Sequence, residues 1–362
     1  MIRGLQVLSL LLLAITLSGC GGGRAMFREN PEHTGVAAAS GPDRLERLVW
    51  KFTAPDKIYS SPVVADGTVY IGCKDGNLYA LDLGDGHVKW TFKTDGNIEA
   101  TPAVQGHTVF VASWDHYVYA IDTSSHKLKW KFRTEGTAYS SPVVSGDTVY
   151  FGGADKILYA VEVDTGRERW HYEAKSGIYS SPAVKGDYVY IGTMGGDLRA
   201  INLRSGQEQW AFATHQRIYS SPALAGEKIY IGSDTKYMYG INIRTGQQIW
   251  KKKTAGKVFS SPAVYGDSVY LGSTDSYIYA YNKETGGRNW EYKTDGPIFS
   301  SPVVASGMVY IGSTDGKLYV MDAEKGTKLW DYKVDDKIYS SPTVADDKVI
   351  FNTVNGEVFA VE

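Results

Sequence analysis

The sequence predicts an all-β protein, an eight-bladed β-propeller made of four-stranded antiparallel blades. Two ladders carry this prediction, because a proline and a tryptophan each recur every 40 residues without an insertion or deletion. The prolines are Pro62, Pro102, Pro142, Pro182, Pro222, Pro262, Pro302 and Pro342. The tryptophans are Trp50, Trp90, Trp130, Trp170, Trp210, Trp250, Trp290 and Trp330. A fixed period of this length indicates a repeat architecture in which each copy is one supersecondary unit.

Each copy predicts a meander of four short strands. In the first full copy, runs rich in apolar residues at 62–64, 68–71, 78–81 and 89–92 are separated by turn dipeptides such as Asp75-Gly76. Such runs between turn residues are typical of antiparallel strands. Val69 and Ile71 lie on one face of the second strand and Tyr70 on the other, so we expect a sheet buried on both faces. Copies must then stack on one another, and radial stacking of four-stranded sheets makes a propeller.

The two ends of the repeat region predict how the ring closes. The last copy runs from Pro342 to Ala360 and stops before its tryptophan strand. Residues 48–52 (LVWKF) are a tryptophan strand with no other strand before it. We therefore expect the eighth blade to combine three C-terminal strands with one N-terminal outer strand, in a propeller domain of residues 48–362.

The repeat resembles a known family. The pattern Ala80-x-Asp82-x-x-Asp85-Gly86-x-x-x-Trp90 and, more closely, residues 239–250 (YGINIRTGQQIW) are similar to the pyrroloquinoline-quinone (PQQ) type propeller repeat, A-x-D-x-x-T-G-x-x-x-W. The resemblance covers residues 48–362 and implies that the eight tryptophans dock between adjacent blades, where an indole offers a large apolar face and an N–H donor. Some members are quinoprotein dehydrogenases, whereas others bind no cofactor and act as scaffolds in outer-membrane protein assembly. The fold alone therefore does not decide the function.

The first residues predict export and a lipid anchor. In residues 1–19 an apolar run follows Arg3, as in a secretion signal and not a spanning helix. The run ends in the sequence LSGC at 17–20, which resembles the bacterial lipobox, so Cys20 is the expected acylation site. An ordinary signal peptide with a chance cysteine is the alternative. Gly21 in place of Asp resembles the sorting pattern for the outer membrane, and we expect the protein on the periplasmic face of that membrane.

Residues 20–47 are predicted to be a lipid-anchored tether. The segment is rich in Gly, Ala and Pro and carries no strand pattern. A flexible chain of this length has an end-to-end distance of about 25–30 Å, enough to let the ring turn above the bilayer. Residues 26–35 (MFRENPEHTG) resemble a segment often found ahead of propellers of this type, so docking of this part onto the ring is the alternative.

The residues at one repeat position predict what the ring offers at its axis. The first strand of each blade is expected to line the axis, and seven aromatic residues and one acid occur at the position of Tyr59. They are Tyr59, Glu99, Tyr139, Tyr179, Tyr219, Phe259, Phe299 and Tyr339. Packing is the favoured interpretation for the aromatic residues. Glu99 is expected either to orient a ligand or partner, or to reach solvent at the mouth.

The turns between second and third strands are the most asymmetric part of the repeats. Asp75-Gly76 suits a two-residue turn that requires positive φ. Blade 2 has Trp114-Asp115-His116-Tyr117 instead, with His116 in the place of the glycine at a local cost of ~1 kcal/mol. Exposed aromatic residues are common anchors of interfaces. We predict partner binding by Trp114, His116, Tyr117, Tyr237, Tyr277 and Glu99; alternatively, the aromatic side chains lie on their own sheets.

The sequence shows no catalytic set. A quinoprotein dehydrogenase would need clustered oxygen ligands for calcium and a carboxylate base, but the aspartates recur in turns, where Asp favours the turn backbone. The seven histidines show no metal-ligand spacing; they are His33, His87, His107, His116, His126, His171 and His215. A net charge of −2 and the lack of a basic stripe argue against a nucleic-acid partner.

We therefore predict a monomeric, non-catalytic, lipid-anchored scaffold with no cofactor and no metal. Its expected partners are envelope proteins, including the outer-membrane β-barrel assembly complex. One alternative is a PQQ-dependent periplasmic oxidoreductase, and another is a receptor for a small ligand or a glycan in the aromatic channel.

The lipid anchor gives a first testable prediction. Replacing Cys20→Ser removes the thiol that would carry the acyl chains, each buried CH₂ of which contributes ~0.8 kcal/mol to membrane binding. We expect unprocessed or soluble protein when membranes are fractionated, whereas a Cys73→Ser control should stay in the membrane fraction. Equal membrane association of both variants would contradict anchoring through Cys20.

Overall fold

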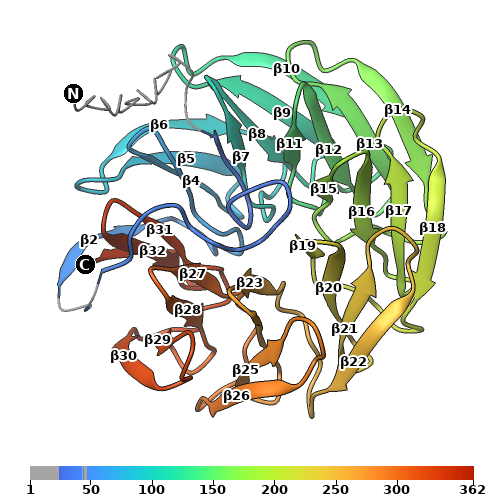
Figure 1. The fold of residues 1–362 in the computed structure, drawn as a ribbon. Helices are drawn as coiled ribbons and strands as arrows, with labels where there is room; N and C mark the ends of the chain where they lie inside the picture. Colours follow the sequence, from blue (N-terminus) through green and yellow to red (C-terminus); the bar gives the residue numbers. More distant parts are fainter. Residues whose placement is uncertain (1–23, 43, 45–46) are drawn as a thin grey trace, which may run out of the picture.

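The protein is a ring of eight β-sheets arranged like propeller blades around a central axis (Figure 1). The computed structural model describes residues 24–42, 44 and 47–362. Every regular element in these ranges is a strand, and they contain no helix of the length and apolar character that a membrane span requires. The predicted all-β, eight-bladed architecture is confirmed.

Each blade has four strands, counted here from the axis outward. The innermost strands are short: β3 (Val63–Ala65), β7 (Ala103–Gln105), β11 (Val143–Ser145), β15 (Ala183–Lys185), β19 (Ala223–Ala225), β23 (Ala263–Tyr265), β27 (Val303–Ala305) and β31 (Thr343–Ala345). The second strands are β4 (Thr68–Gly72), β8 (Thr108–Ala112), β12 (Thr148–Gly152), β16 (Tyr188–Gly192), β20 (Lys228–Ser233), β24 (Ser268–Gly272), β28 (Met308–Gly312) and β32 (Lys348–Asn352). The third strands are β5 (Asn77–Asp82), β9 (Tyr117–Asp122), β13 (Ile157–Glu162), β17 (Asp197–Asn202), β21 (Tyr237–Asn242), β25 (Tyr277–Asn282), β29 (Lys317–Asp322) and β33 (Glu357–Val361). The outer strands are β6 (Val88–Lys93), β10 (Leu128–Arg133), β14 (Glu168–Glu173), β18 (Glu208–Ala213), β22 (Gln248–Lys253), β26 (Arg288–Lys293), β30 (Lys328–Lys333) and β2 (Leu48–Thr53).

The eighth blade joins the two ends of the repeat region, as predicted. Its sheet has the order β2-β33-β32-β31, so the outer strand comes from the N-terminal side of the ring. Strand β2 pairs antiparallel with β33, with Lys51 opposite Phe359 and Thr53 opposite Glu357. Arg47 and Glu362 exchange two further backbone hydrogen bonds of 2.9 and 3.0 Å. Because this strand closes the ring, the sheet of the last blade is complete.

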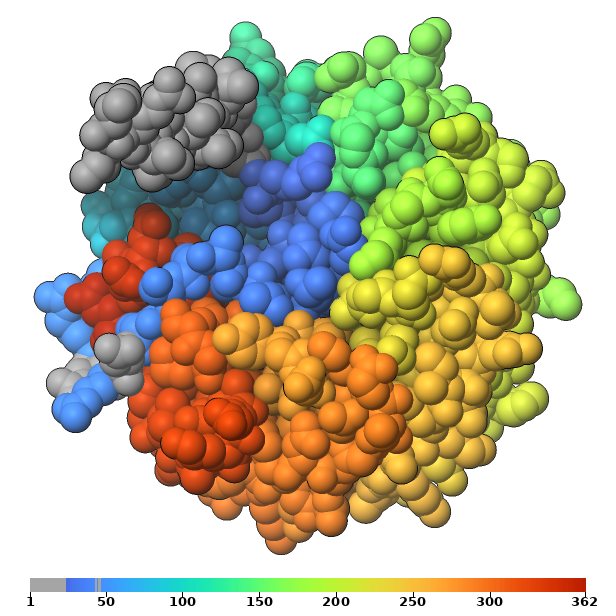
Figure 2. All heavy atoms as spheres, in the orientation of Figure 1, coloured from blue at the N-terminus to red at the C-terminus, as the bar shows by residue number. Residues whose placement is uncertain are grey.

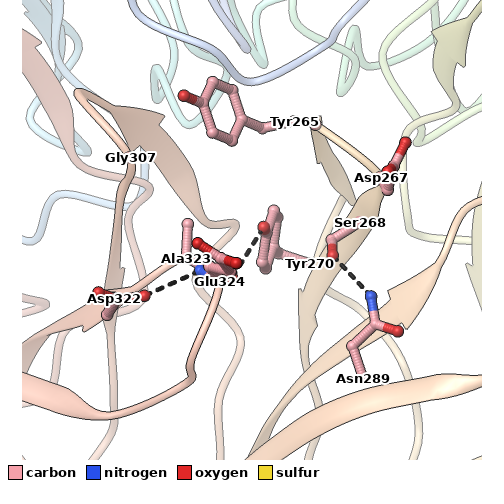
Figure 3. A pocket seen from close by; sticks show the side chains of 10 residues that line it. Tyr265, Asp267, Ser268, Tyr270, Asn289, Gly307, Asp322, Ala323 and Glu324 are labelled. Carbon is pink, nitrogen blue, oxygen red and sulfur yellow. Dashed lines mark hydrogen bonds between the residues drawn. The ribbon is translucent and has the colours of Figure 1, made fainter.

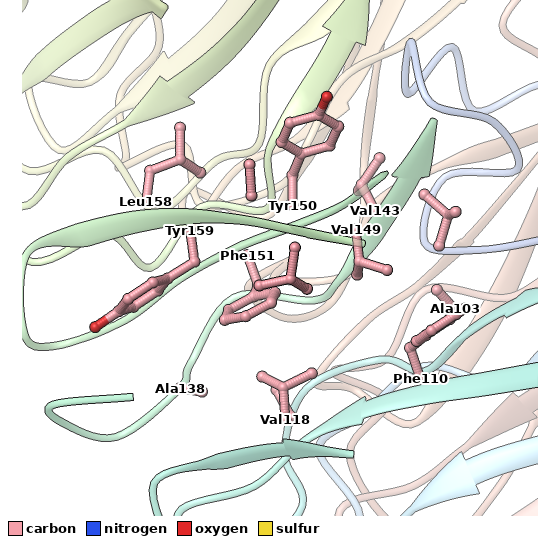
Figure 4. Packing of buried hydrophobic residues seen from close by; sticks show 14 of the residues in the cluster. Ala103, Phe110, Val118, Ala138, Val143, Val149, Tyr150, Phe151, Leu158 and Tyr159 are labelled. Atoms are coloured by element: carbon pink, nitrogen blue, oxygen red, sulfur yellow. The ribbon is translucent and has the colours of Figure 1, made fainter. Parts of the chain in front are cut away.

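Apolar side chains on both faces of the inner three strands hold neighbouring blades together (Figure 4). On β12, Tyr150 and Phe151 point to opposite faces because successive side chains of a strand alternate. Phe151 packs edge-on against Phe132 of the preceding blade, with ring centroids 5.7 Å apart. Each side chain of this size that is fully buried contributes about 1.5–3 kcal/mol. The core is therefore shared between blades, and no blade buries its two faces alone.

A closed ring of hydrogen bonds links all eight blades near the axis. In each blade the backbone N–H of the residue just before the repeated proline donates to the side-chain hydroxyl of the equivalent residue in the next blade, over 2.9–3.2 Å. The participants are Ser61, Thr101, Ser141, Ser181, Ser221, Ser261, Ser301 and Ser341, and Ser341 donates back to Ser61. We call this set the hydroxyl ring.

The serine just before each hydroxyl-ring residue forms hydrogen bonds within its own blade. Ser60 Oγ accepts the N–H of Gly72 at 2.9 Å and donates to its carbonyl at 3.0 Å, which ties the chain to the end of the second strand. Six other blades repeat the bond from the strand backbone to this serine. Blade 2 has Ala100 at this position. The repeated Ser-Ser-Pro motif thus carries one bond within a blade and one between blades.

The tryptophans of blades 1 to 6 and of blade 8 lie against the turn between the third and outer strands of the next blade. Trp50 Nε1 donates to the carbonyl of Leu83 at 2.9 Å, and its ring covers Gly86, where a Cβ would lie 2.6 Å from the indole. Trp130, Trp170, Trp250 and Trp290 donate to the equivalent carbonyl over 2.7–3.1 Å. Trp210 contacts Gly246, Trp90 stacks on His126 at 5.1 Å, and Trp330 Nε1 has no acceptor in the described ranges.

Residues 24–37 form a plug over one mouth of the ring. Figure 2 shows the beginning of the described chain, in blue, filling the centre of this face. Strand β1 (Arg24–Ala25) pairs with β7, and four innermost strands then donate one backbone N–H each to plug carbonyls over 2.7–2.8 Å. The four donors are Val184, Leu224, Val264 and Val304. Residues 24–37 are thus bound to the ring and do not contribute to a flexible link.

Two polar side chains of the plug, Arg28 and His33, are buried. The guanidinium of Arg28 donates to the carbonyls of Pro262, at 2.7 Å, and Pro302. Burial lowers the pKa of Arg28 to about 9, an effect partly offset by the neighbouring Glu29. Burial, assisted by the charge of Arg28, lowers the pKa of His33 to about 3, so His33 is neutral. Gly35 permits this packing, because a Cβ there would lie 2.1 Å from Arg28 Nη2.

The hydroxyl ring can be tested with matched substitutions. Ser221→Ala leaves the buried N–H of Ser181 without its acceptor, and we expect a loss of about 1–3 kcal/mol in the free energy of unfolding. Ser221→Thr keeps a hydroxyl, as Thr101 does naturally in blade 2, and should unfold close to the wild-type urea midpoint. Equal destabilisation by both substitutions would contradict a role for the hydroxyl.

The plug can be tested by amide hydrogen exchange. Arg28→Ala removes the two bonds to proline carbonyls, so the four amides that donate to the plug should exchange at least several-fold faster. The amides of the hydroxyl ring should not change. Arg24→Ala is the control, because Arg24 is exposed and its guanidinium donates to Gln105 at the surface. Indistinguishable exchange in the two variants would refute anchoring by Arg28.

Candidate functional site

The aromatic residues at the Tyr59 position gather at the mouth opposite the plug. In each blade the chain runs from this residue through the hydroxyl ring to the innermost strand. In five blades the middle residue of that innermost strand contacts the plug. Six consecutive pairs of rings, from Tyr139 round to Tyr59, have centroids 4.4–6.4 Å apart. We call these seven residues the aromatic collar: Tyr59, Tyr139, Tyr179, Tyr219, Phe259, Phe299 and Tyr339. All seven are half-buried, so a part of each side chain faces solvent.

An ion pair fills the one gap in the collar. Glu99 occupies the eighth position, and its carboxylate lies 3.6 Å from Lys74 Nζ. The same ammonium lies 5.6 Å from the ring centroid of Tyr59 and 5.8 Å from that of Trp114. Trp114 in turn packs edge-on against Tyr139, at 5.3 Å. Two predicted partner-binding residues, Glu99 and Trp114, are therefore brought together, and Lys74 is a third member that the sequence analysis missed.

The electrostatics of this gap favour a polar contact. Burial raises the pKa of Glu99, and the charge of Lys74 opposes that shift. The indole Nε1 of Trp114 is buried and has no acceptor within the described ranges. The half-buried carboxylate, the ammonium and the indole can each make a polar contact to a partner, and the aromatic residues beside them are of the type that is enriched in protein–protein interfaces.

A second ion pair lies on the other side of the collar. Lys257 Nζ is 3.0 Å from the carboxylate of Asp234 and 5.7 Å from the ring centroid of Phe259. The side chain of Asp234 is 6% exposed, and its other oxygen lacks a hydrogen-bond partner among the described residues. Asp234 occupies the repeat position of Trp114 and Lys74. The residue type at this position, which lies beside the collar, therefore differs between blades. Comparing the repeats at that position would have revealed all three residues.

The remaining predicted partner-binding residues lie on their own sheets. Tyr117 and Tyr237 each pack beside the tyrosine two residues further along the same strand, with ring centroids 6.0 and 6.1 Å apart, and Tyr277 stacks on Tyr279 at 5.7 Å. Lysines of the adjoining outer strands cover the rings of Tyr117 and Tyr237. His116 takes φ 72°, as its place in the glycine position predicts. The structure therefore does not join these residues into one patch with Trp114 and Glu99.

Two further groups bear on chemistry. Asp82, Asp85 and His87 bring three possible metal-ligand atoms within 4.8 Å of one another in an exposed turn. Cys73 is fully buried, and burial raises the pKa of its thiol to about 12, so it stays protonated. Cys20, the predicted acylation site, lies outside the described residues. The lipid anchor, the absence of catalysis and the absence of a cofactor stay predictions.

Solved structures with this architecture carry out different functions. The chain superposes on BamB from Moraxella catarrhalis with a TM-score of 0.75 and 17% identity, covering 87% of this chain and 99% of that one. A europium-containing methanol dehydrogenase gives a TM-score of 0.83 at 16% identity over 94% and 98% of the two chains. The computationally designed protein Ika8 gives 0.79 at 16% identity over 87% and 99%. At these identities the likeness concerns the fold.

Two family models match parts of the chain. Residues 183–362 match the β-propeller of the beta-alanine-activating enzyme. No curated protein sequence matches the chain. Residues 34–101 and 94–217 match the PQQ-type repeat model described as outer membrane protein assembly factor BamB. Because those two ranges together span just over half of the 362 residues, the chain belongs to this family of PQQ-type β-propellers, of which BamB is the named member.

Proposed function

We propose that the protein is a non-catalytic, lipid-anchored scaffold on the periplasmic face of the outer membrane, where it binds envelope proteins during outer-membrane protein assembly. The observation that carries this proposal is the aromatic collar with its Glu99–Lys74 gap and Trp114. Half-buried aromatic side chains in a rigid frame offer a large contact area at a low cost in side-chain entropy. The family membership supports the same role.

The plug supports the collar as the contact surface. It occupies the centre of the opposite face and inserts Arg28 between the carbonyls of Pro262 and Pro302. A partner segment can therefore reach the axis from the collar side. The hydroxyl ring holds the eight collar positions in a fixed register, so a partner meets a preformed surface and loses less entropy on binding.

A PQQ-dependent oxidoreductase is the second candidate, because a methanol dehydrogenase shares the fold over nearly its whole length. Adding PQQ and Ca²⁺ to the purified protein separates the candidates. Bound-quinone absorbance with reduction of an electron-accepting dye would favour the enzyme, and the scaffold proposal expects neither signal.

The collar proposal predicts the outcome of photocrosslinking in the intact envelope. A photoreactive residue in place of Phe259 should yield an adduct with an outer-membrane assembly protein, identified by mass spectrometry. The same residue in place of Val88, on an outer strand and 42% exposed, should not yield that adduct. Trp114→Ala should lower the adduct several-fold, whereas Tyr117→Ala should leave it unchanged because Tyr117 lies on its own sheet.

Three results would oppose the collar as a binding surface. They are identical adducts from the Phe259 and Val88 positions, no adduct from Phe259, and an equal loss in the Trp114→Ala and Tyr117→Ala variants.

A further inference from the structure

A pocket of about 540 Å³ opens between the sixth and seventh blades, away from the collar (Figure 3). Its walls come from the first turn and second strand of blade 6 and from the turn between the third and outer strands of blade 7. Tyr265 and Asn289 are exposed, whereas Tyr270 and Ser268 are buried. Glu324 reaches in from blade 7.

A short side chain at one repeat position leaves this space open. In the first three blades a long cationic side chain reaches the hydroxyl at the start of the second strand: Lys89 to Thr68 at 3.0 Å, Lys129 to Thr108 at 2.8 Å and Arg169 to Thr148 at 3.0 Å. In blade 6 the equivalent Asn289 makes the same contact to Ser268, at 2.8 Å, with a much shorter side chain. This position holds an ammonium or guanidinium in the first three blades and no cation in the other five, and in blade 6 it holds Asn289.

The charge of the walls suits a cation. Asp322 and Glu324 form no ion pair with any described residue, whereas Asp82, the repeat equivalent of Asp322 in blade 1, lies 3.6 Å from Lys89 Nζ. Blade 7 has Leu329 where blade 1 has that lysine. Asp267, at the opening, is paired with Lys283 at 3.3 Å. Two carboxylates at the pocket are left without a charged partner.

The aromatic wall adds a second attraction. Tyr265 is 41% exposed, and its repeat equivalents are Ala, Gln, Ser or Lys, so blade 6 alone carries an aromatic ring at this position. A tyrosine face attracts an ammonium or guanidinium through its quadrupole. Tyr270 is held by a bond from its hydroxyl to the carbonyl of Ala323 at 3.0 Å, and it forms a fixed apolar floor. Burial raises the pKa of its phenol, and the nearby carboxylates add to that shift.

We propose that this pocket binds an ammonium or guanidinium group on an alkyl chain, supplied either by a basic side chain of a protein or by a free amine. The cationic head lies near Ser268 and the carboxylates of Asp322 and Glu324, and the alkyl chain lies between Tyr265 and Tyr270. The site includes the end of the innermost strand of blade 6 and contains no collar residue, so its test is independent of the proposed function.

Calorimetric titration of the full chain with 1,5-diaminopentane tests the proposal. We expect saturable binding that weakens as salt is raised and is absent for 1,5-pentanediol, which has the same length and no charge. Asn289→Lys should weaken binding at least tenfold, because it supplies the internal cation that Lys129 provides in blade 2. Ile249→Lys is the matched control: it adds the same charge at the same repeat position in blade 5, is 43% exposed, and should bind like wild type.

A second variant guards against misfolding. Tyr265→Ala places the residue of blades 5 and 7 in blade 6 and should weaken diamine binding several-fold with an unchanged melting temperature.

Titration with acetyl-Gly-Lys-Gly-amide identifies the source of the cation. Binding of both the peptide and the diamine indicates a protein side chain, and binding of the diamine alone indicates a free amine. No saturable binding to wild type, or equal weakening in Asn289→Lys and Ile249→Lys, would overturn the proposal.

Discussion

The fold depends on a circular chain of hydrogen bonds from backbone amide to side-chain hydroxyl. Each blade contributes one donor and one acceptor, and the series returns from Ser341 to Ser61. An unpaired buried amide costs about 1–3 kcal/mol, so every member of the ring constrains the distance between its two neighbouring blades. The tryptophans set the same spacing at the outer edge. Because the distance between neighbouring blades is fixed both near the axis and at the outer edge, each blade has little freedom to tilt.

Both proposed binding sites lie where the repeat departs from its consensus. Seven blades carry an aromatic residue at the collar position, and the exception is Glu99 with its partner Lys74. The pocket between blades 6 and 7 arises in the same way, from Asn289 and Tyr265 at positions that carry other residue types elsewhere. A regular frame makes such departures effective, because one shortened or lengthened side chain alters a local surface without moving the backbone around it.

The architecture could be predicted from the sequence because it follows from the 40-residue repeat, and a repeat can be recognised without knowing any side-chain contact. The closure by residues 48–52 and the strand pattern belong to this class. The hydroxyl ring was visible only as a repeated Ser-Ser-Pro, since nothing in one copy shows that its hydroxyl meets a different copy. The contacts of Lys74 with Glu99 and Trp114 depend on the inclination of two blades. Residues 24–37 have no period, so pattern alone did not reveal five docking contacts with inner strands.

The start of the plug limits how far the ring can lie from Cys20. Arg24 is already paired with Gln105 on the ring, and only four peptide links separate it from Cys20. Four extended residues reach at most about 14 Å, roughly half the span of a free 28-residue leader. If Cys20 carries the proposed acyl group, this short link turns the plug face toward the lipid headgroups and the collar away from the membrane.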